Sequence, residues 1–196
     1  MRARLRAHAL PAEFFLIVIA LTPFAQAQSR TIDTTRSTLT VRVFKAGLFS
    51  FAAHDHEIQA PIASGSLVES EKASVELAVD ARQLKVLDAQ LDADKRAEVQ
   101  RTMHSSDVLD SARFSEIRFR SASIEKTGEG KWTVRGDLTL HGQTQPVLVN
   151  VTGGNGHYRG SSTFKQRAFG MKPVSIAGGT IKVKDEVRIE FEVFAR

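Results

Sequence analysis

The stretch VRGDLTLHGQTQPVLVNV, residues 134–151, decides how this chain folds. Apolar residues occupy alternate positions in it, namely Val134, Leu138, Leu140, Val147, Val149 and Val151. Polar residues such as Arg135, Asp137 and Thr139 separate the first of them. Because successive side chains of a β-strand point to opposite faces, the pattern predicts strands with one buried face and one face in water.

The same alternation recurs along the chain beyond Arg30. Strands are predicted over residues 39–43, 75–79, 117–120, 134–140, 147–151 and 187–193, with weaker ones over 64–69, 158–165 and 175–183. Glycine-rich turn signals at 127–130, 153–156 and 178–179 separate them. This spacing is typical of an antiparallel meander, sandwich or barrel. Residues 88–110 are instead rich in charged residues, Ala and Gln, and predict a helix with a loop.

The first residues, MRARLRAHALPAEFFLIVIALTPFAQAQ, have the three parts of a secretory signal peptide. Arginines precede an apolar run centred on residues 14–21, and Ala25-Gln26-Ala27 is a small-x-small cleavage pattern. The alternative is an uncleaved membrane anchor, but the run is shorter than the roughly 20 apolar residues that span a bilayer. We therefore expect cleavage after Ala27, a single domain over residues 28–196, and a periplasmic location.

The composition excludes several classes of function. The formal net charge is +5, part of it within the predicted signal peptide, and the basic residues are scattered. A nucleic-acid surface needs a clustered basic patch, so no nucleic-acid partner is expected. The chain has no cysteine, which excludes disulfides, thiolate metal sites and covalent c-type haem. There is also no GxSxG motif, so hydrolytic chemistry is not expected.

The sequence His54-Asp55-His56-Glu57 is the strongest candidate for chemistry. In a strand, His54 and His56 share a face and could converge on one metal ion. The spacing does not place a third ligand beside them, although the candidates are His104, His141 and His157. Two further interpretations stay open at this point, which are solvated histidines at a barrel mouth and histidines that contact the polar end of an organic ligand.

The alternation also predicts small residues on the inner face of the sheet. The positions are Ser121, Gly136, Gly160 and Ser162. Small inward residues leave volume unfilled, and barrels of about eight strands either fill themselves or enclose one small ligand. Phe119, Phe164 and Phe191 are inward candidates to fill those gaps. The residues alone leave a ligand cavity and a filled core as equal alternatives.

Three stretches together resemble the YceI-like family of periplasmic proteins. They are SARFSEIRFRSASIE (111–125), VRGDLTLHGQTQPVLVNV (134–151) and FKQRAFGM (164–171). The segment DADKRAEVQRTMHSSDVLD (92–110) lies where that family has a helical insertion. The resemblance extends from about residue 38 to residue 195. Two departures are the missing proline in Phe114-Ser115-Glu116-Ile117 and the histidine pair of residues 54–57.

The resemblance implies an all-β fold with one accessory helix, an extended antiparallel lipocalin-like β-barrel of about eight strands. It also implies a long apolar cavity that binds a polyisoprenoid chain, such as a quinone or a related lipid. No catalytic residues belong to the family, so no enzymatic activity is expected. The motif residues that look structural are Gly136, Asp137, Thr139, Gly142 and Pro146.

The first hypothesis is therefore a non-enzymatic carrier of a long isoprenoid-type lipid. The expected apolar lining is Val43, Phe49, Phe51, Phe119, Leu138, Phe164, Phe169 and Phe191. The expected polar contacts at the mouth are His54 and His56, and no cofactor is expected beyond the lipid. The second hypothesis is a metal- or haem-binding envelope module that uses these histidines in support of an inner-membrane redox protein. A filled barrel that acts only through interactions is a third, and a homodimer stays open.

Overall fold

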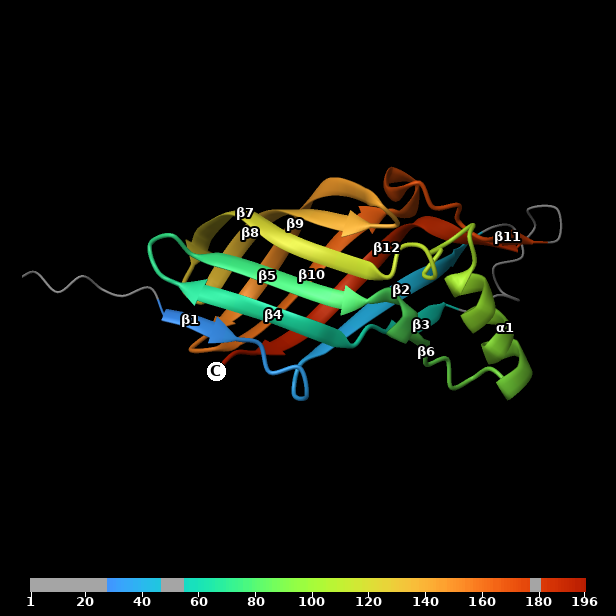
Figure 1. The fold of residues 1–196 in the computed structure, drawn as a ribbon, viewed down its shortest axis with the longest axis horizontal. Coiled ribbons are helices and arrows are strands. Elements are labelled where there is room, and N and C mark those ends of the chain that lie inside the picture. Colours follow the sequence, from blue (N-terminus) through green and yellow to red (C-terminus); the bar gives the residue numbers. More distant parts are fainter. Residues whose placement is uncertain (1–27, 47–54, 177–180) are drawn as a thin grey trace, which may run out of the picture.

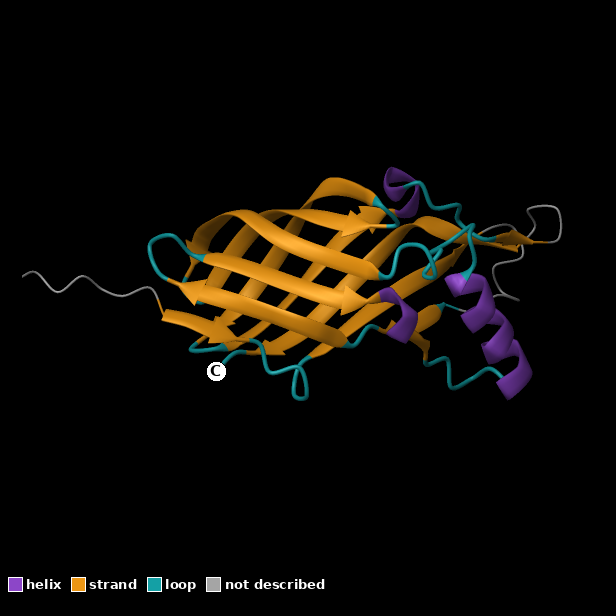
Figure 2. Ribbon diagram, in the orientation of Figure 1, coloured by secondary structure: helices purple, strands orange, loops and turns teal. Residues whose placement is uncertain are grey.

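The computed structural model describes residues 28–46, 55–176 and 181–196. They form a curled antiparallel β-sheet with one α-helix at one end (Figure 1 and Figure 2). The predicted class, an all-β lipocalin-like fold with one accessory helix, is confirmed. The predicted signal segment 1–27 and the predicted site residues Phe49, Phe51 and His54 lie outside the described residues.

Short and long strands make up the sheet. The strands of the first half of the chain are β1 (Gln28–Thr31), β2 (Thr38–Ala46), β3 (His56–Gln59), β4 (Ile62–Glu69), β5 (Ser74–Asp80) and β6 (Lys85–Val86). Those of the second half are β7 (Glu116–Gly128), β8 (Lys131–Leu140), β9 (Gln143–Gly154), β10 (His157–Lys165), β11 (Ser175–Ile176) and β12 (Ile181–Phe194). The order across the sheet is β1-β4-β5-β7-β8-β9-β10-β12-β2-β3-β6, with β11 paired to β12.

The two sides of the curled sheet meet at β1. This strand pairs with β4 on one side. On the other side, Thr31 and Arg196 exchange two backbone hydrogen bonds of 2.9 Å, next to a bridge between Ile32 and Ala195. The long strand β12 pairs with both β10 and β2 and so continues the sheet around. Backbone pairing therefore encircles the interior at the end of the barrel where β1 lies between β4 and the last residues of the chain.

More strands are present than the eight or so that were expected. Three additional strands arise because three runs of chain are interrupted, namely residues 28–46, 56–69 and 74–86, and the two-residue strand β11 is a fourth. Pro61, which has no N–H to give to a ladder, separates β3 from β4. The 3-10 helix η2 (Ala81–Gln83) separates β5 from β6, and the Asp80 side chain caps it by accepting from the Arg82 N–H at 3.0 Å.

A side chain of the helix α1 (Ala93–His104) extends the short edge strand β6. The Asp92 carboxylate caps the helix by accepting from the Lys95 N–H at 2.9 Å. From within the helix, the amide of Gln100 accepts from the Val86 N–H at 2.8 Å and donates to the Leu84 carbonyl at 2.7 Å. These bonds satisfy backbone groups that a sheet edge otherwise leaves unpaired. The predicted helix within residues 88–110 is confirmed.

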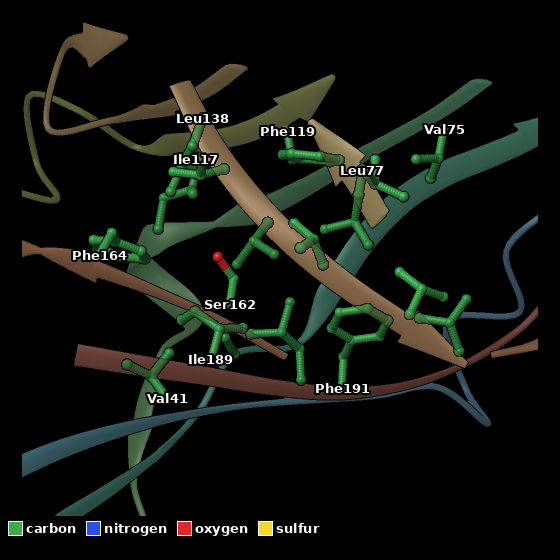
Figure 3. A pocket seen from close by; sticks show the side chains of 18 of the residues that line it. Val41, Val75, Leu77, Ile117, Phe119, Leu138, Ser162, Phe164, Ile189 and Phe191 are labelled. Atoms are coloured by element: carbon green, nitrogen blue, oxygen red, sulfur yellow. The ribbon is translucent and has the colours of Figure 1, made fainter. Parts of the chain in front are cut away.

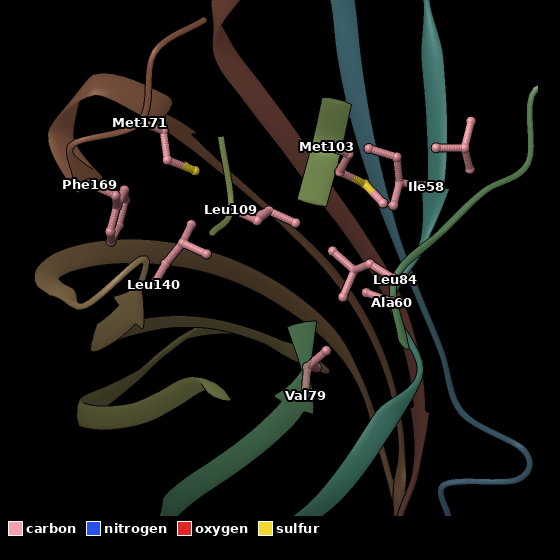
Figure 4. Packing of buried hydrophobic residues seen from close by; sticks show 10 residues of the cluster. Ile58, Ala60, Val79, Leu84, Met103, Leu109, Leu140, Phe169 and Met171 are labelled. Atoms are coloured by element: carbon pink, nitrogen blue, oxygen red, sulfur yellow. The ribbon is translucent and has the colours of Figure 1, made fainter. Parts of the chain in front are cut away.

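The main hydrophobic core lies at the helix end of the barrel (Figure 4). Its buried members are Ile58, Ala60, Val79, Leu84, Val86, Met103, Leu109, Leu140, Phe169 and Met171. They come from the strands, from α1 and from the connections between these elements, and each is at most 8% exposed. This cluster closes the helix end of the barrel with packed apolar side chains. None of the helices in the described ranges has the length and apolar character to cross a membrane.

Candidate ligand cavity

A cavity of about 620 Å³ occupies the interior of the barrel (Figure 3). Its wall is mostly apolar, and the side chains labelled in the figure are Val41, Val75, Leu77, Ile117, Phe119, Leu138, Ser162, Phe164, Ile189 and Phe191. These side chains share one face because cross-strand partners in an antiparallel sheet point the same way. Leu77, Phe119 and Leu138, for example, are successive partners across β5, β7 and β8. The period-two pattern in the sequence thus becomes a continuous apolar wall.

Two phenylalanines fill the space left by inward glycines without filling the barrel. The ring of Phe119 lies against Gly136, and a Cβ at that glycine would lie 2.5 Å from the ring. The ring of Phe191 lies in the same way against Gly160, its direct cross-strand partner. Both phenylalanines still border the cavity. Of the two alternatives left open by the sequence, the structure therefore shows a cavity.

Five of the predicted lining residues border the cavity: Val43, Phe119, Leu138, Phe164 and Phe191. Phe169 is placed differently from its prediction. It is completely buried at the closed end, where its ring packs edge-on against Phe164 with centroids 5.1 Å apart, and it is not among the wall residues. The short 3-10 helix η3 (Gln166–Phe169) turns it away from the strand direction of β10. Phe169 therefore supports the wall from behind.

His56 lies at the helix end of the barrel and is not among the wall residues of the cavity. Its Nδ1 lies 2.6 Å from Asp88 Oδ2, and the other oxygen of Asp88 accepts from the Glu57 N–H at 2.8 Å. The Asp88 side chain is 0% exposed and the His56 side chain 20%. Because a carboxylate only accepts, Nδ1 of His56 carries the ring proton. His56 borders a separate hollow of about 280 Å³ with Arg42 and Asp88 among its walls. The predicted contact of this histidine with the polar end of a ligand stays a prediction.

Among the residues that the structure describes, the other histidines do not lie beside His56. His104 contacts Ser111 at 2.8 Å and Gln100 at 2.6 Å, beside α1. His141 contacts the Phe169 carbonyl at 3.0 Å, and His157 contacts Glu192 at 2.7 Å. Within the ranges that the structure describes, no group of three or more His, Asp or Glu side chains is arranged to hold a metal ion. The metal or haem hypothesis stays a prediction, because His54 lies outside those ranges.

Several polar side chains of the cavity wall lie instead at the opposite end of the barrel, namely Glu69, Ser70, Asn155 and Tyr158. Tyr158 is the second residue of β10 and Glu69 ends β4, and the tyrosine hydroxyl donates to Glu69 Oε1 at 2.5 Å. Arg30 Nε, on β1, is buried and lies 3.1 Å from the other oxygen of Glu69 as an ion pair without hydrogen-bond alignment. Trp132 packs edge-on against Tyr158, with centroids 5.8 Å apart. Burial, followed by the bond to Glu69, raises the pKa of Tyr158 to about 12.

This polar end was missed by reasoning from the sequence, although a signal was present. Gly160, Ser162 and Phe164 were assigned to the inner face, and one further step of two residues toward the N-terminus reaches Tyr158. Its partner Glu69 ends a strand whose pattern is weak. Nothing in the sequence indicates that two residues 89 positions apart share a hydrogen bond.

An antiparallel sheet curled around one apolar cavity, with a helix at its closed end, defines the lipocalin-like class of barrel-shaped proteins. Within that class, the chain belongs to the YceI-like domain family, whose model matches residues 31–195.

Curated relatives of the chain include a UPF0312 protein of Vibrio cholerae serotype O1, 29% identical over 104 residues that cover 48% of this chain and 53% of the relative. A UPF0312 protein of Pseudomonas syringae pv. tomato is 36% identical over 86 residues that cover 39% of this chain and 45% of the relative. In these matches the chain spans about half the length of the curated relatives.

Two solved structures share the fold. BcnA of Burkholderia cenocepacia matches with a TM-score of 0.66 and 20% identity over 84% of this chain and 99% of BcnA. A polyisoprenoid binding domain from Saccharophagus degradans, implicated in plant cell wall breakdown, matches with a TM-score of 0.54 and 12% identity over 87% of this chain and 99% of that domain. At these identities the likeness concerns the fold.

Proposed function

We propose that this protein binds and carries a long apolar lipid of the isoprenoid type inside its barrel, without catalysing a reaction. The observation that carries the proposal is the cavity of about 620 Å³ with its apolar wall. Its size lies within the usual range of ligand sites in proteins. The choice of ligand class is supported by the fold neighbour from Saccharophagus degradans, which is a polyisoprenoid binding domain.

The energetics of such a complex favour a long apolar chain. Transfer of apolar surface from water contributes about 25 cal/mol per Å². A buried tail of several hundred Å² then gains on the order of 10 kcal/mol before the costs of association are subtracted. A quinone-like lipid satisfies this requirement with its isoprenoid tail, and we propose it as the specific ligand.

We propose a periplasmic location for this carrier, because residues 1–27 have the pattern of a signal peptide. There it would exchange lipid with the inner membrane, where a redox protein that uses quinones is the proposed partner. Separation of periplasmic and cytoplasmic fractions from cells that express the full chain tests the location. Recovery of the protein in the cytoplasmic fraction alone contradicts it.

Extraction of the purified native protein tests the lipid itself. The full chain is purified from the periplasm, extracted with organic solvent, and the extract is analysed by mass spectrometry. We expect an isoprenoid lipid in a fixed ratio to protein. The variant Leu77→Trp places a large ring on the cavity wall and should lose that lipid, whereas Glu76→Trp on the exposed outer face of the same strand should keep it. An empty wild-type protein contradicts the proposal.

A further inference from the structure

The cavity has a mostly apolar closed end, where the Gln166 amide already donates to the Lys184 carbonyl at 2.8 Å, and a second end with several polar side chains, so a lipid inside it has a preferred direction. At the closed end, the wall includes Leu84, Met103 and Leu109 of the buried core. At the other end, the wall includes Ser70 and Asn155, which are exposed to solvent. An apolar tail is most stable beside the apolar core. At the open end it would cover polar side chains of the protein without offering them a hydrogen-bond partner, which costs free energy. The head of the lipid then lies beside Glu69 and Tyr158.

The hydrogen bonds already made at the open end leave acceptors for a ligand. The Tyr158 hydroxyl donates its hydrogen bond to Glu69, so the lone pairs of the phenolic oxygen are left as acceptors, and both residues line the cavity. Glu69 accepts from Tyr158 with one oxygen and lies 3.1 Å from Arg30 Nε with the other, and a carboxylate has about four lone-pair sites. Arg30 is not among the wall residues, whereas Glu69 is. Both acceptor groups therefore belong to residues of the cavity wall, whereas the compensating cation belongs to a residue outside it.

From this arrangement we infer that Glu69 and Tyr158 select a lipid whose head donates a hydrogen bond, meaning an alcohol, a phenol or a hydroquinone, over a phosphorylated head. A hydroxyl can donate to either oxygen, whereas a phosphate has only acceptors and negative charge to offer to a carboxylate. The same reasoning favours the reduced, hydroxyl-bearing form of a quinone over the oxidised form, whose carbonyls only accept. The inference rests on the proposed function, because it concerns the head of a lipid held in the same cavity.

Trp132 provides a direct reporter for the test. It is the single tryptophan of the chain, it borders the cavity, and it packs on Tyr158. The lipid-free full-length protein is titrated with phytanol, phytanyl phosphate and phytane, which share one isoprenoid skeleton and differ only in the head. Binding is followed by Trp132 emission and by native mass spectrometry. We expect phytanol to bind about tenfold more tightly than the phosphate, the factor that corresponds to 1.4 kcal/mol.

The variants separate the head-group inference from the proposed function. Glu69→Gln should reduce the preference for phytanol over the phosphate, and Tyr158→Phe should weaken phytanol binding by about threefold to tenfold while phytane binding is unchanged. The matched control is Glu190→Gln, because Glu190 pairs with Arg42 and Arg188 on the outer face. If all three ligands bind wild type equally and Glu69→Gln changes nothing, the head-group inference is overturned while lipid binding stands. If none of them binds by either measurement, the proposed function fails and the inference with it.

Discussion

The ring of Phe191 on β12 lies against the backbone of Gly160 on β10, its direct cross-strand partner. The absence of a side chain at residue 160 thus gives the ring its place on the barrel wall, and the space beyond the ring remains available as cavity. A glycine that breaks the apolar alternation of its strand in this way makes room for a wall residue of the neighbouring strand.

Substitution of this glycine should therefore destabilise the barrel. In Gly160→Ala the new methyl group meets the ring of Phe191 and the carbonyl oxygen of Asn150, so either the ring or the backbone must shift. We expect the free energy of unfolding to fall by about 1–3 kcal/mol, as for other overpacked sites. Urea denaturation measures the change. Thr163→Ala, at an exposed position of the same strand, should cost less than about 1 kcal/mol. Unchanged stability of Gly160→Ala would mean that the ring has room to move.

The raised pKa of Tyr158 predicts a loss of stability in strong alkali. Burial and the bond to Glu69 raise this pKa from about 10 to about 12 in the folded protein. The neutral phenol is therefore favoured by folding, and its contribution is complete below the unfolded pKa and is lost as the pH rises through the folded pKa. The single tyrosine of the chain makes its absorbance at alkaline pH unambiguous. Glu69→Gln should lower the titration midpoint, although burial keeps it above the usual value. An unshifted wild-type midpoint would count against the bond.

The turn between β1 and β2 predicts a sensitivity to acid. The Thr35 hydroxyl, which donates to Asp33 at 2.7 Å, is the main reason that the pKa of Asp33 is lowered, and the N–H groups of Thr35 and Arg36 contribute. A lowered folded pKa gives stability that is present above the unfolded value and is lost as the pH falls through the folded one.

The variant Asp33→Asn should therefore be less stable than wild type at neutral pH and should lose less stability on acidification. Urea denaturation between pH 7 and pH 2 measures both effects. Thr35→Ser keeps the hydroxyl and should retain the acid dependence of wild type. Parallel stability curves for wild type and Asp33→Asn over this range would show that the turn does not contribute to the acid response.

The buried carboxylate of Asp88 predicts a structural role for the contacts that it makes with His56 and Glu57. Asp88→Asn replaces the carboxylate that binds both the His56 ring and the Glu57 N–H, so we expect the free energy of unfolding to fall by about 1–3 kcal/mol. The bound lipid should be unaffected, since neither residue borders the cavity. Asp137→Asn, exposed on the outer face of β8, is the control. Loss of lipid without loss of stability in Asp88→Asn would assign this pair a role in binding instead.

The local pattern was sufficient to predict the class of the fold. Alternation of apolar residues in β7, β8, β9 and β12 was confirmed strand by strand, because strand formation and the choice of inner face depend on residues two positions apart. The same rule placed Val43, Phe119, Leu138, Phe164 and Phe191 on the inner face, where they border the cavity. Phe169 escaped the rule because a 3-10 turn replaces the strand at that residue.

The sequence by itself thus determined that this protein is built of antiparallel strands with one apolar face, since that alternation is repeated in most of the long strands, and its resemblance to a known family indicated the barrel. Only the tertiary structure decided that the barrel keeps a cavity, because the volume left inside depends on how Phe119 and Phe191 lie over glycines of neighbouring strands. It also decided which end of the cavity is polar. The pairing of Tyr158 with Glu69, and of His56 with Asp88, depends on strand register and on the path of loops, which join residues far apart in the chain.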